Sequence, residues 1–367
     1  MKHNKKLLPA WLLVLIDSAL IAVYILGFYY SYYLNPRQLE SAGVKTNQER
    51  QDSLSNSSMN FNDVESAAGG NETDTANENI IDETVGANQS AASDETTPPK
   101  TTDNSTATGN LRTKFAQHFS DTVVSTDNSY TSRDISIQVN KYTEGSDGNI
   151  VTYYVADIYI ADITCLASGF AKDTYGIGYA EDLLSMDESF NAILAINGDY
   201  YGNGGDGVVI RNGEVYRKTS SDSDVCVLYY DGTMKTYSAD EFDVNRAITD
   251  GAYQAWCFGP ELLDKAGRSI TEFTASRHIK EENPRTAIGY YESGHYAFVV
   301  VDGRQSGYSY GMTLSELSDL FENLGCKTAY NLDGGKSSEM SFHDTLVNRP
   351  AEGGREVSDC IMIKEVK

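Results

Sequence analysis

The sequence predicts an α+β fold, in which a strand-rich mixed sheet and few helices form a single globular domain behind an N-terminal apolar segment. Short runs rich in β-branched and aromatic residues recur between residues 135 and 363, separated by Gly, Asn and Asp, which is typical of strands and turns. Strong helical periodicity is confined to residues 313–324. Strands and helices do not alternate regularly, so the sequence does not predict the strand–helix–strand units of a parallel sheet.

The first 34 residues contain a long apolar run, Leu7 to Leu34, which follows three lysines. A membrane-spanning helix needs about 20 apolar residues, whereas the apolar core of a cleaved signal peptide has about 7–15. Tyrosines near the end of the run fit a membrane interface, and the basic residues before it favour a cytoplasmic N-terminus. We therefore expect residues 1–34 to form a cytoplasmic tip and an uncleaved transmembrane helix, with the rest of the chain outside the cell membrane.

Residues 35–110 have a different composition. They are rich in Asn, Ser, Thr, Ala, Asp and Glu, they lack apolar periodicity, and they hold thirteen acidic side chains against four basic ones. Such a segment cannot bury enough apolar surface to offset its ordering entropy, so we expect a disordered acidic stalk. The remaining residues, 111–367, are enough for one globular domain.

The charge and the cysteines restrict the function classes. A formal net charge of −24 argues against nucleic acid as a partner. The five cysteines have wide, irregular spacings without a Cys-x-x-Cys pair, so a zinc cluster is not expected. We expect most of them to be buried apolar residues rather than a disulfide framework. They are Cys165, Cys226, Cys257, Cys326 and Cys360.

The elements of the domain follow from local patterns. Two alternating runs, Ile135–Val139 and Val151–Ile160, flank turn residues and predict a hairpin. Thr313 and Glu316 form a capping-box pattern before a leucine stripe, and Gly325 ends that helix. The further predicted elements are a helix at Glu181–Phe190 and strands at Ala192–Ile196, Gly207–Ile210, Val225–Tyr230, Arg285–Tyr290, Tyr296–Val301 and Asp359–Ile363.

Polar side chains gather at the ends of predicted strands, where loops on a rigid scaffold commonly carry function. The most informative cluster is residues 331–338, Asn-Leu-Asp-Gly-Gly-Lys-Ser-Ser, in which glycines allow several N–H groups to face one ligand. The other clusters are residues 197–202, Asn-Gly-Asp-Tyr-Tyr-Gly, residues 283–289, Asn-Pro-Arg-Thr-Ala-Ile-Gly, and residues 302–305, Asp-Gly-Arg-Gln. Each alone is ordinary turn chemistry, so it is the set that predicts a site.

Two carboxylates and an arginine are the groups needed to cleave a glycosidic bond beside a phosphate. Asp302 and Asp333 are predicted as an acid–base pair, in which one group protonates or stabilises the leaving side and the other activates water. Their individual roles stay open. Arg285 is predicted to bind phosphate oxygens through paired N–H groups.

In order and spacing these clusters resemble the phosphodiester glycosidase family over roughly residues 150–367. The resemblance is carried by the segments 197–201, 284–287, 302–304 and 331–337, by the helix between the last two, and by the tail 348–359. Two positions depart from the family pattern. Lys336 stands where an animal member of the family has glycine, and Asp199 stands where many relatives have glycine or alanine.

The resemblance implies a hydrolase that cleaves the bond between the anomeric carbon of a sugar and the phosphate of a phosphodiester, without a cofactor. Together with the anchor, it predicts sugar-phosphate substrates in cell-envelope or exopolysaccharide glycans. Asp333, Asp302 and Arg285 are the implied catalytic residues. The implied substrate-binding residues are Asn197, Tyr200, Tyr201, Arg304, Asn331, Gly334, Gly335, Ser337 and Arg355.

Two alternatives stay open at this point. The pocket can belong to an envelope module that binds glycan without turnover. Asp302, Asp333 and Asp199 can instead hold Ca²⁺ or Mg²⁺ in a metal-dependent phosphodiesterase, although no His pair or metal-ligand spacing in the sequence supports such a site. The isolated histidines, among them His278 and His295, are expected to be surface or satisfied side chains.

Overall fold

The computed structural model describes residues 10–29, 35–46, 111–146 and 148–366. Helix α1 (Ala10–Tyr29) lies within the predicted apolar run. Across the described ranges, no helix is both long enough and apolar enough to cross a membrane. Most of the predicted stalk lies outside the described residues.

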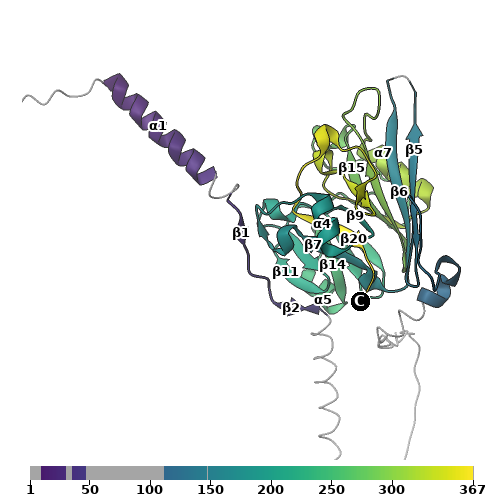
Figure 1. Ribbon diagram of the computed structural model, residues 1–367. Helices are drawn as coiled ribbons and strands as arrows, with labels where there is room; N and C mark the ends of the chain where they lie inside the picture. Colours follow the sequence, from purple (N-terminus) through teal and green to yellow (C-terminus); the bar gives the residue numbers. More distant parts are fainter. Residues whose placement is uncertain (1–9, 30–34, 47–110, 147, 367) are drawn as a thin grey trace, which may run out of the picture.

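The domain is built on three larger antiparallel sheets (Figure 1). The seven-stranded sheet has the order β17-β15-β16-β6-β5-β4-β3. Its central strands β5 (Ile135–Glu144) and β6 (Val151–Ile160) form the predicted hairpin, paired from Ile135↔Ile160 to Glu144↔Val151. The other strands are β3 (Val124–Ser125), β4 (Ser129–Thr131), β15 (Arg285–Glu292), β16 (His295–Val301) and β17 (Thr328–Asn331).

The two other sheets share the opposite side of the core. The five-stranded sheet has the order β19-β18-β9-β20-β7, with β7 (Leu166–Phe170), β9 (Leu194–Asn197), β18 (Met340–Phe342), β19 (Thr345–Leu346) and β20 (Asp359–Ile363). The six-stranded sheet has the order β13-β12-β14-β10-β11-β2. Its strands are β2 (Val44–Lys45), β10 (Val208–Arg211), β11 (Glu214–Lys218), β12 (Val225–Tyr229), β13 (Met234–Tyr237) and β14 (Ala252–Cys257).

The α+β class and the low helix content are confirmed. The sheet differs from the predicted mixed one, because every strand pairing among the described residues is antiparallel. A run of apolar residues shows that a strand is buried, but it carries no information about the direction of the neighbouring strand.

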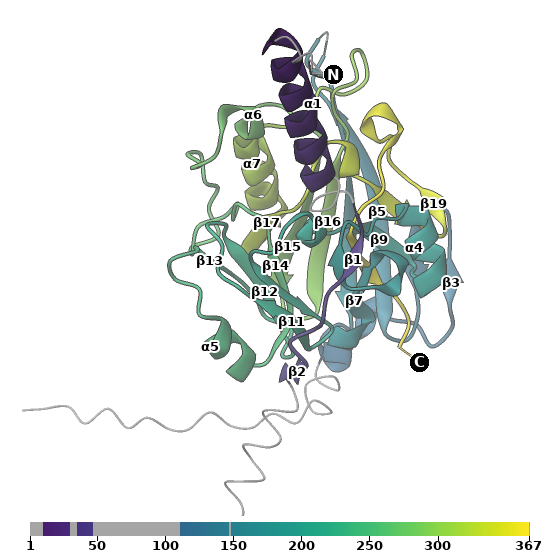
Figure 2. The same cartoon turned by 90° about the vertical axis from the view of Figure 1, so that its left-hand side faces the viewer.

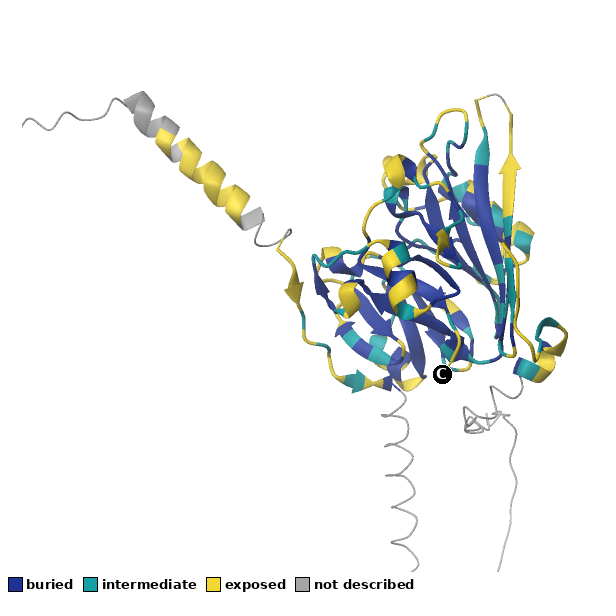
Figure 3. Cartoon of the chain, viewed as in Figure 1, coloured by how far each residue is buried: buried dark blue, intermediate teal, exposed yellow. Residues whose placement is uncertain are grey.

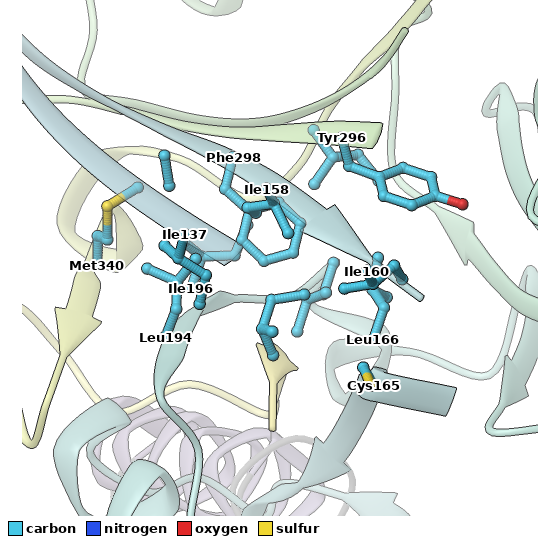
Figure 4. Packing of buried hydrophobic residues seen from close by; sticks show 14 of the residues in the cluster. Ile137, Ile158, Ile160, Cys165, Leu166, Leu194, Ile196, Tyr296, Phe298 and Met340 are labelled. Atoms are coloured by element: carbon cyan, nitrogen blue, oxygen red, sulfur yellow. The ribbon is translucent and has the colours of Figure 1, made fainter. Parts of the chain in front are cut away.

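The main core lies between the seven-stranded sheet and the two others. Alternate residues of β16 face it, among them Tyr296 and Phe298, and belong to one apolar cluster with Ile196 of β9 and Met340 of β18 (Figure 4). The intervening residues of β16, such as Val299, face a second apolar cluster on the other side of the sheet. Because successive side chains of a strand point to opposite faces, a strand buried on both faces reads as an unbroken apolar run.

Helices cover the outer faces of the sheets. Helix α7 (Leu314–Leu324) packs Leu317 and Phe321 on the seven-stranded sheet. It has the predicted capping box, and Gly325 ends it in the left-handed conformation. Helix α4 (Leu183–Phe190) covers the five-stranded sheet and α5 (Val244–Thr249) the six-stranded one. Figure 3 shows strands that are buried for most of their length, whereas the tip of the β5–β6 hairpin is exposed.

Short elements complete the domain. Helix α6 (Arg277–Lys280) precedes β15. The 3-10 helices are η2 (Ala116–His118), η3 (Ile163–Cys165), η4 (Ala171–Asp173), η5 (Tyr201–Asn203), η6 (Gly335–Ser337) and η7 (Ala351–Gly353). All five cysteines are free thiols, four of them buried and Cys257 half-buried, which confirms the prediction made from their spacing.

Part of the segment assigned to the stalk by composition belongs to the domain. Strand β1 (Arg37–Gln38) pairs with β8 (Gly176–Ile177), and β2 pairs with β11. Figure 2 shows this segment lying across the face of the molecule that is turned to the viewer. Two short strands in a polar sequence are too weak a pattern to predict, because their stability comes from the edges they join.

Candidate active site

The antiparallel register places the predicted catalytic loops together. Ala287 of β15 is opposite Asn331 of β17, so the start of β15, at Arg285, lies beside the loop that follows β17. Asn197 at the end of β9 joins the two sheets at this point. Its Nδ2 donates a hydrogen bond to the backbone oxygen of Asp333 at 2.7 Å, and its Oδ1 accepts one from the Thr286 hydroxyl at 2.7 Å.

Glycines allow the loop after β17 to pack tightly. A Cβ added to Gly334 would lie 2.8 Å from the backbone oxygen of Pro284, closer than such contacts occur. Gly335 has a φ of +70°, and its N–H donates to the same oxygen at 3.0 Å. The glycine pair therefore permits a close approach to the Pro284–Arg285 backbone and a left-handed turn.

Asp333 is the centre of a compact hydrogen-bonded group. Its Oδ2 accepts from the Ser337 hydroxyl at 2.6 Å and from Nη2 of Arg355 at 2.7 Å, while Nε of Arg355 donates to the same hydroxyl at 2.5 Å. Burial raises the pKa of Asp333, and the bonds from Ser337 and Arg355 oppose that rise. The loop, the 3-10 helix η6 and the segment before β20 thus hold one carboxylate in a fixed position.

Two further arginines lie next to this group. Arg285 is buried, and it donates through Nε and Nη2 to the backbone oxygens of Met312, Ile279 and Glu281 at 2.7–2.9 Å. Burial, with a contribution from the charge of Arg304, lowers the pKa of Arg285 to about 10, so it is protonated at neutral pH.

Arg304 has a left-handed backbone conformation, with a φ of 58°. Its guanidinium donates to Oδ1 of Asn283 through Nη2 at 2.7 Å. Tyr200, on the other side of the site, also has a positive φ of 64°. Backbone strain of this kind concentrates at functional sites, where surrounding contacts impose it.

Asp333 and the three arginines line a cavity of about 290 Å³. Among the described residues that line it, four are basic, Arg285, Arg304, Lys336 and Arg355, and one, Asp333, is a carboxylate. The predicted residues Asn331, Gly334 and Gly335 line it too. This cavity is therefore strongly cationic in a chain whose formal net charge is −24, and it is suited to a phosphate group.

A second cavity, of about 650 Å³, adjoins the first, and the two share Phe258 and Ile279 in their linings. Tyr200 and Tyr201 line the larger one. Tyr200 is exposed, and the guanidinium of Arg355 lies 5.1 Å from the centre of its ring. Tyr201 is buried and stacks on Tyr175. The exposed ring of Tyr200 is therefore the one available to stack on a sugar.

The two predicted asparagines lie differently. Asn197 is fully buried and binds only protein groups among the described residues, so it orients the Asp333 loop. Asn331 lines the smaller cavity, and its Nδ2 donates to the backbone oxygen of Gly259 at 2.8 Å. Asn197, which was implied as a substrate-binding residue, is a positioning residue in this geometry.

The structure does not bring Asp302 into the cavity. Its carboxylate accepts hydrogen bonds from Nδ2 of Asn348 and the hydroxyl of Tyr308, both at 2.8 Å, and from the backbone N–H of Arg349 at 3.1 Å. Asp302 therefore fixes the loop that follows β18 and β19 rather than facing substrate. Its motif position, at a strand end before Gly-Arg, could not distinguish these two roles.

Asp199, the third carboxylate considered for a metal, belongs to a different buried group. Nη2 of Arg211 donates a hydrogen bond to Oδ1 of Asp199 at 2.8 Å and another to Oδ2 of Asp359 at 2.9 Å. Burial, with the charge of Asp199, raises the pKa of Asp359 to about 7. Within the described residues, no three His, Cys, Asp or Glu side chains are grouped so that they could hold a metal ion.

Some cavity residues were missed by the sequence reasoning. His278, expected to be a surface or satisfied side chain, lines the cavity, as do Phe258, Asn283 and Lys336. Asn283 and Lys336 belong to the strand-end motifs at residues 283–289 and 331–338. Their position beside predicted site residues could therefore have indicated that they line the cavity. His278 and Phe258 follow no motif, and only the path of the chain before β15 brings them to the site.

The comparisons with known proteins agree with this geometry. Residues 190–364 match the family model described as phosphodiester glycosidase. The chain is 31% identical over 196 residues to the SPbeta prophage-derived uncharacterized protein YomE of Bacillus subtilis (strain 168). That alignment covers 52% of this chain and 30% of YomE, so the chain spans less than a third of the length of this relative.

A solved structure shares the fold. It is the zebrafish N-acetylglucosamine-1-phosphodiester alpha-N-acetylglucosaminidase catalytic domain, auto-inhibited by its pro-peptide, with a TM-score of 0.51 and 18% identity over 63% of this chain and 84% of that one. The family match spans β9 to β20 and includes the whole lining of the smaller cavity. The resemblance seen in the sequence is confirmed for this part of the chain, because residues 190–364 match the phosphodiester glycosidase family.

Proposed function

We propose that the domain hydrolyses sugar-1-phosphodiesters at the bond between the anomeric carbon and the phosphate oxygen. Overall, the hydroxyl group of a water molecule is added to the anomeric carbon. The remaining proton of that water is taken first by Asp333 and then passes to the departed phosphomonoester or to solvent. The products are a free sugar and a phosphomonoester, and no bond to phosphorus is broken.

The observation that carries this proposal is the charge of the smaller cavity. Three arginines and a lysine line the cavity together with Asp333. The lysine, Lys336, also pairs with Glu352, and the arginines are the groups that can bind a phosphate beside a reacting carboxylate. Arg355 contacts both Asp333 and Ser337, so a phosphate bound near Arg355 would lie within reach of Asp333.

The basic residues that line the cavity also explain how the reaction can proceed with one carboxylate, although the sequence predicted a pair. A departing phosphomonoester has a second pKa of about 6, so it leaves readily without full protonation when positive groups stabilise its charge. Arg285, Arg304 and Arg355 supply that stabilisation, and Asp333 takes the proton of the attacking water. Tyr200 offers its ring to the sugar.

The cellular context of the proposal comes from the sequence. The apolar run at residues 7–34 would anchor the chain in the cell membrane with the domain outside, where glycosyl phosphates of the cell envelope or an exopolysaccharide are the accessible substrates. The name of the zebrafish relative adds N-acetylglucosamine 1-phosphodiesters to the compounds worth testing.

The experiment incubates the full chain with UDP-sugars and with sugar-phosphate-sugar diesters, with and without EDTA, and measures free sugar. Release of sugar by the wild type and its loss in Asp333→Asn supports the proposal. Asp319→Asn is the matched control, because Asp319 is an exposed carboxylate on α7. Binding of these compounds without release favours the glycan-binding module, and loss of activity with EDTA favours the metal-dependent phosphodiesterase.

A further inference from the structure

An extended segment near the N-terminus lies along β8 and β11. The edges of these two strands, with the neighbouring residues that contact the segment, are called its groove. Strand β1 pairs with β8 through Arg37↔Ile177 and Gln38↔Gly176, and β2 pairs with β11 through Val44↔Val215 and Lys45↔Glu214. Between and beyond these pairs, three backbone N–H groups donate to the domain. The bonds run from Leu39 to Tyr175, from Ala42 to Tyr216 and from Thr46 to Gly213, at 3.0–3.2 Å.

Side chains on one side of the segment complete the contact. Leu39 packs into an apolar cluster with Phe170 and Tyr175, and Val44 packs against the core beneath the six-stranded sheet. Thr46 is fully buried, and its hydroxyl bonds to the backbone oxygen of Gly213. The opposite side, represented by Gln38 and Glu40, is exposed.

A polar anchor sets the register of the segment. The carboxylate of Glu214 on β11 accepts from the Ser41 hydroxyl at 3.1 Å and pairs with the ammonium group of Lys45. Backbone bonds that add a strand provide affinity, while pockets for alternate side chains and a charged contact provide specificity. These are the features of a peptide-recognition groove rather than of a chance surface contact.

We propose that this groove is a strand-addition site for residues 36–46, which holds the N-terminal part of the chain to the domain independently of the covalent connection. These strand pairings, backbone hydrogen bonds and apolar contacts of residues 36–46 are made with residues that follow position 165 in the sequence. Residues 47–110 connect the two parts covalently. Cutting that connection therefore leaves the N-terminal piece bound.

The groove also adjoins the larger cavity. The N–H of Gly176, on the strand that receives β1, donates to the hydroxyl of Tyr201 at 3.3 Å, and Gly178 donates to the backbone oxygen of Gly202 at 3.1 Å. Tyr201 packs in the same cluster as Leu39 and lines the cavity. The bound segment thus supports the wall that carries Tyr200, the residue before it.

The test is a full chain with a site-specific protease sequence inserted between Asn88 and Gln89 and an affinity tag at the N-terminus. After complete cleavage at a protein concentration of about 10 μM, a level that favours a micromolar complex, the C-terminal piece is expected to elute with the tagged piece. Separation of the two pieces on cleavage would overturn the proposal. This readout requires no substrate, so it is independent of the proposed hydrolysis.

Two variants of the cleaved protein identify the groove as the cause. Leu39→Asp places a charge in the apolar cluster and is expected to release the C-terminal piece. Gln38→Asp introduces the same charge on the exposed side and is expected to retain it. If both variants behave alike, the groove does not hold the pieces together.

A measurement on the intact wild type covers the case in which a variant does not fold. The amide protons of Leu39, Ala42 and Thr46 donate to backbone oxygens of the domain, so their hydrogen exchange should be slowed at least about tenfold relative to the unfolded chain. Exchange at the unfolded rate at all three positions would contradict the proposal, whatever the variants do.

Discussion

At the scale of single residues, the function depends on one buried carboxylate and the basic groups around it. Asp333 is held by Ser337 and Arg355, and burial keeps its pKa above that of an ordinary aspartate. Such a group is a stronger base than a free carboxylate once it is ionised, and it is the residue whose chemistry the proposal requires.

Asp333→Asn is expected to lower turnover by roughly 10²–10⁴-fold, because the amide cannot take a proton from water. The fold should survive, since the amide oxygen can still accept from Ser337. Steady-state release of free sugar checks the prediction, with circular dichroism to confirm folding. A folded variant with wild-type turnover would remove Asp333 from the mechanism.

Arg355→Ala is expected to move the acidic limb of the rate–pH profile to higher pH. The positive charge of Arg355 lowers the pKa of Asp333, while burial raises it. Removing the charge therefore raises the pKa further, and the active, ionised form is reached only at higher pH. Arg355→Lys retains the charge, so its limb should stay nearer to that of the wild type. An unmoved limb in Arg355→Ala would show that another group sets it.

At the scale of elements, three buried carboxylates in two hydrogen-bonded groups join strands and loops rather than react. Asp302 connects the end of β16 to the loop at residues 348–349. Asp359 at the start of β20 and Asp199 after β9 share the guanidinium of Arg211 on β10. These two hydrogen-bonded groups hold the strand ends and loops near the cavities in fixed positions relative to one another.

Asp302→Asn is expected to reduce stability by about 1–3 kcal/mol, the range for weakening a buried charged hydrogen-bond group. Its effect on turnover per folded molecule should be far smaller than that of Asp333→Asn, because Asp302 lies outside the cavity lining. Urea unfolding and kinetics on the same preparations separate the two effects. A loss of turnover equal to that of Asp333→Asn would restore the predicted acid–base pair.

Asp359→Asn is expected to change how stability depends on pH. Burial, with the neighbouring charge of Asp199, raises the pKa of Asp359 in the folded protein to about 7, whereas an unfolded aspartate has a pKa near 4. Between these two pKa values the folded state binds more protons than the unfolded state, so this group lowers the free energy of unfolding as the pH rises. Above about pH 7 both states have lost the proton, and the group no longer changes the free energy of unfolding with pH.

The measurement is the free energy of unfolding at several pH values between 5 and 8 for the wild type and Asp359→Asn. The difference, variant minus wild type, should increase as the pH rises toward 7 and then level off. Other buried carboxylates with raised pKa values, such as Asp187, are present in both proteins and cancel. A difference that is constant with pH would contradict the prediction.

At the scale of the whole molecule, the domain is larger than its composition indicates. Residues 36–46 add strands to two sheets, and the cationic cavity lies within a chain of net charge −24. A cavity lined by basic groups attracts an anionic group electrostatically, even in a chain whose net charge is negative.

A chain that begins at Leu111 is expected to have a lower melting temperature than one that includes residues 35–46. It lacks β1 and β2, and the apolar pockets for Leu39 and Val44 become exposed. A loss of about 1 kcal/mol lowers the melting temperature of a domain this size by about 2–4 °C. Calorimetry of both proteins provides the test, and equal melting temperatures would show that the segment contributes no stability.

The sequence by itself determined much of the scaffold. The hairpin at residues 135–160, the helix at 314–324 with its capping box, and the strand at 359–363 are local patterns, and the structure has all of them. The resemblance carried by the strand-end motifs also identified the family. These features depend on side-chain periodicity, caps and turns, which neighbouring residues specify.

Tertiary structure decided which motif residues share a site. Asp302 and Asp333 both follow strands before Gly, yet only Asp333 lines the cationic cavity, because strand register and the loop at residues 348–349 direct Asp302 elsewhere. His278 enters the cavity through the path of its loop, and residues 36–46 join sheets more than a hundred residues away in sequence. Such contacts depend on pairings across long sequence separations, and local patterns do not encode them.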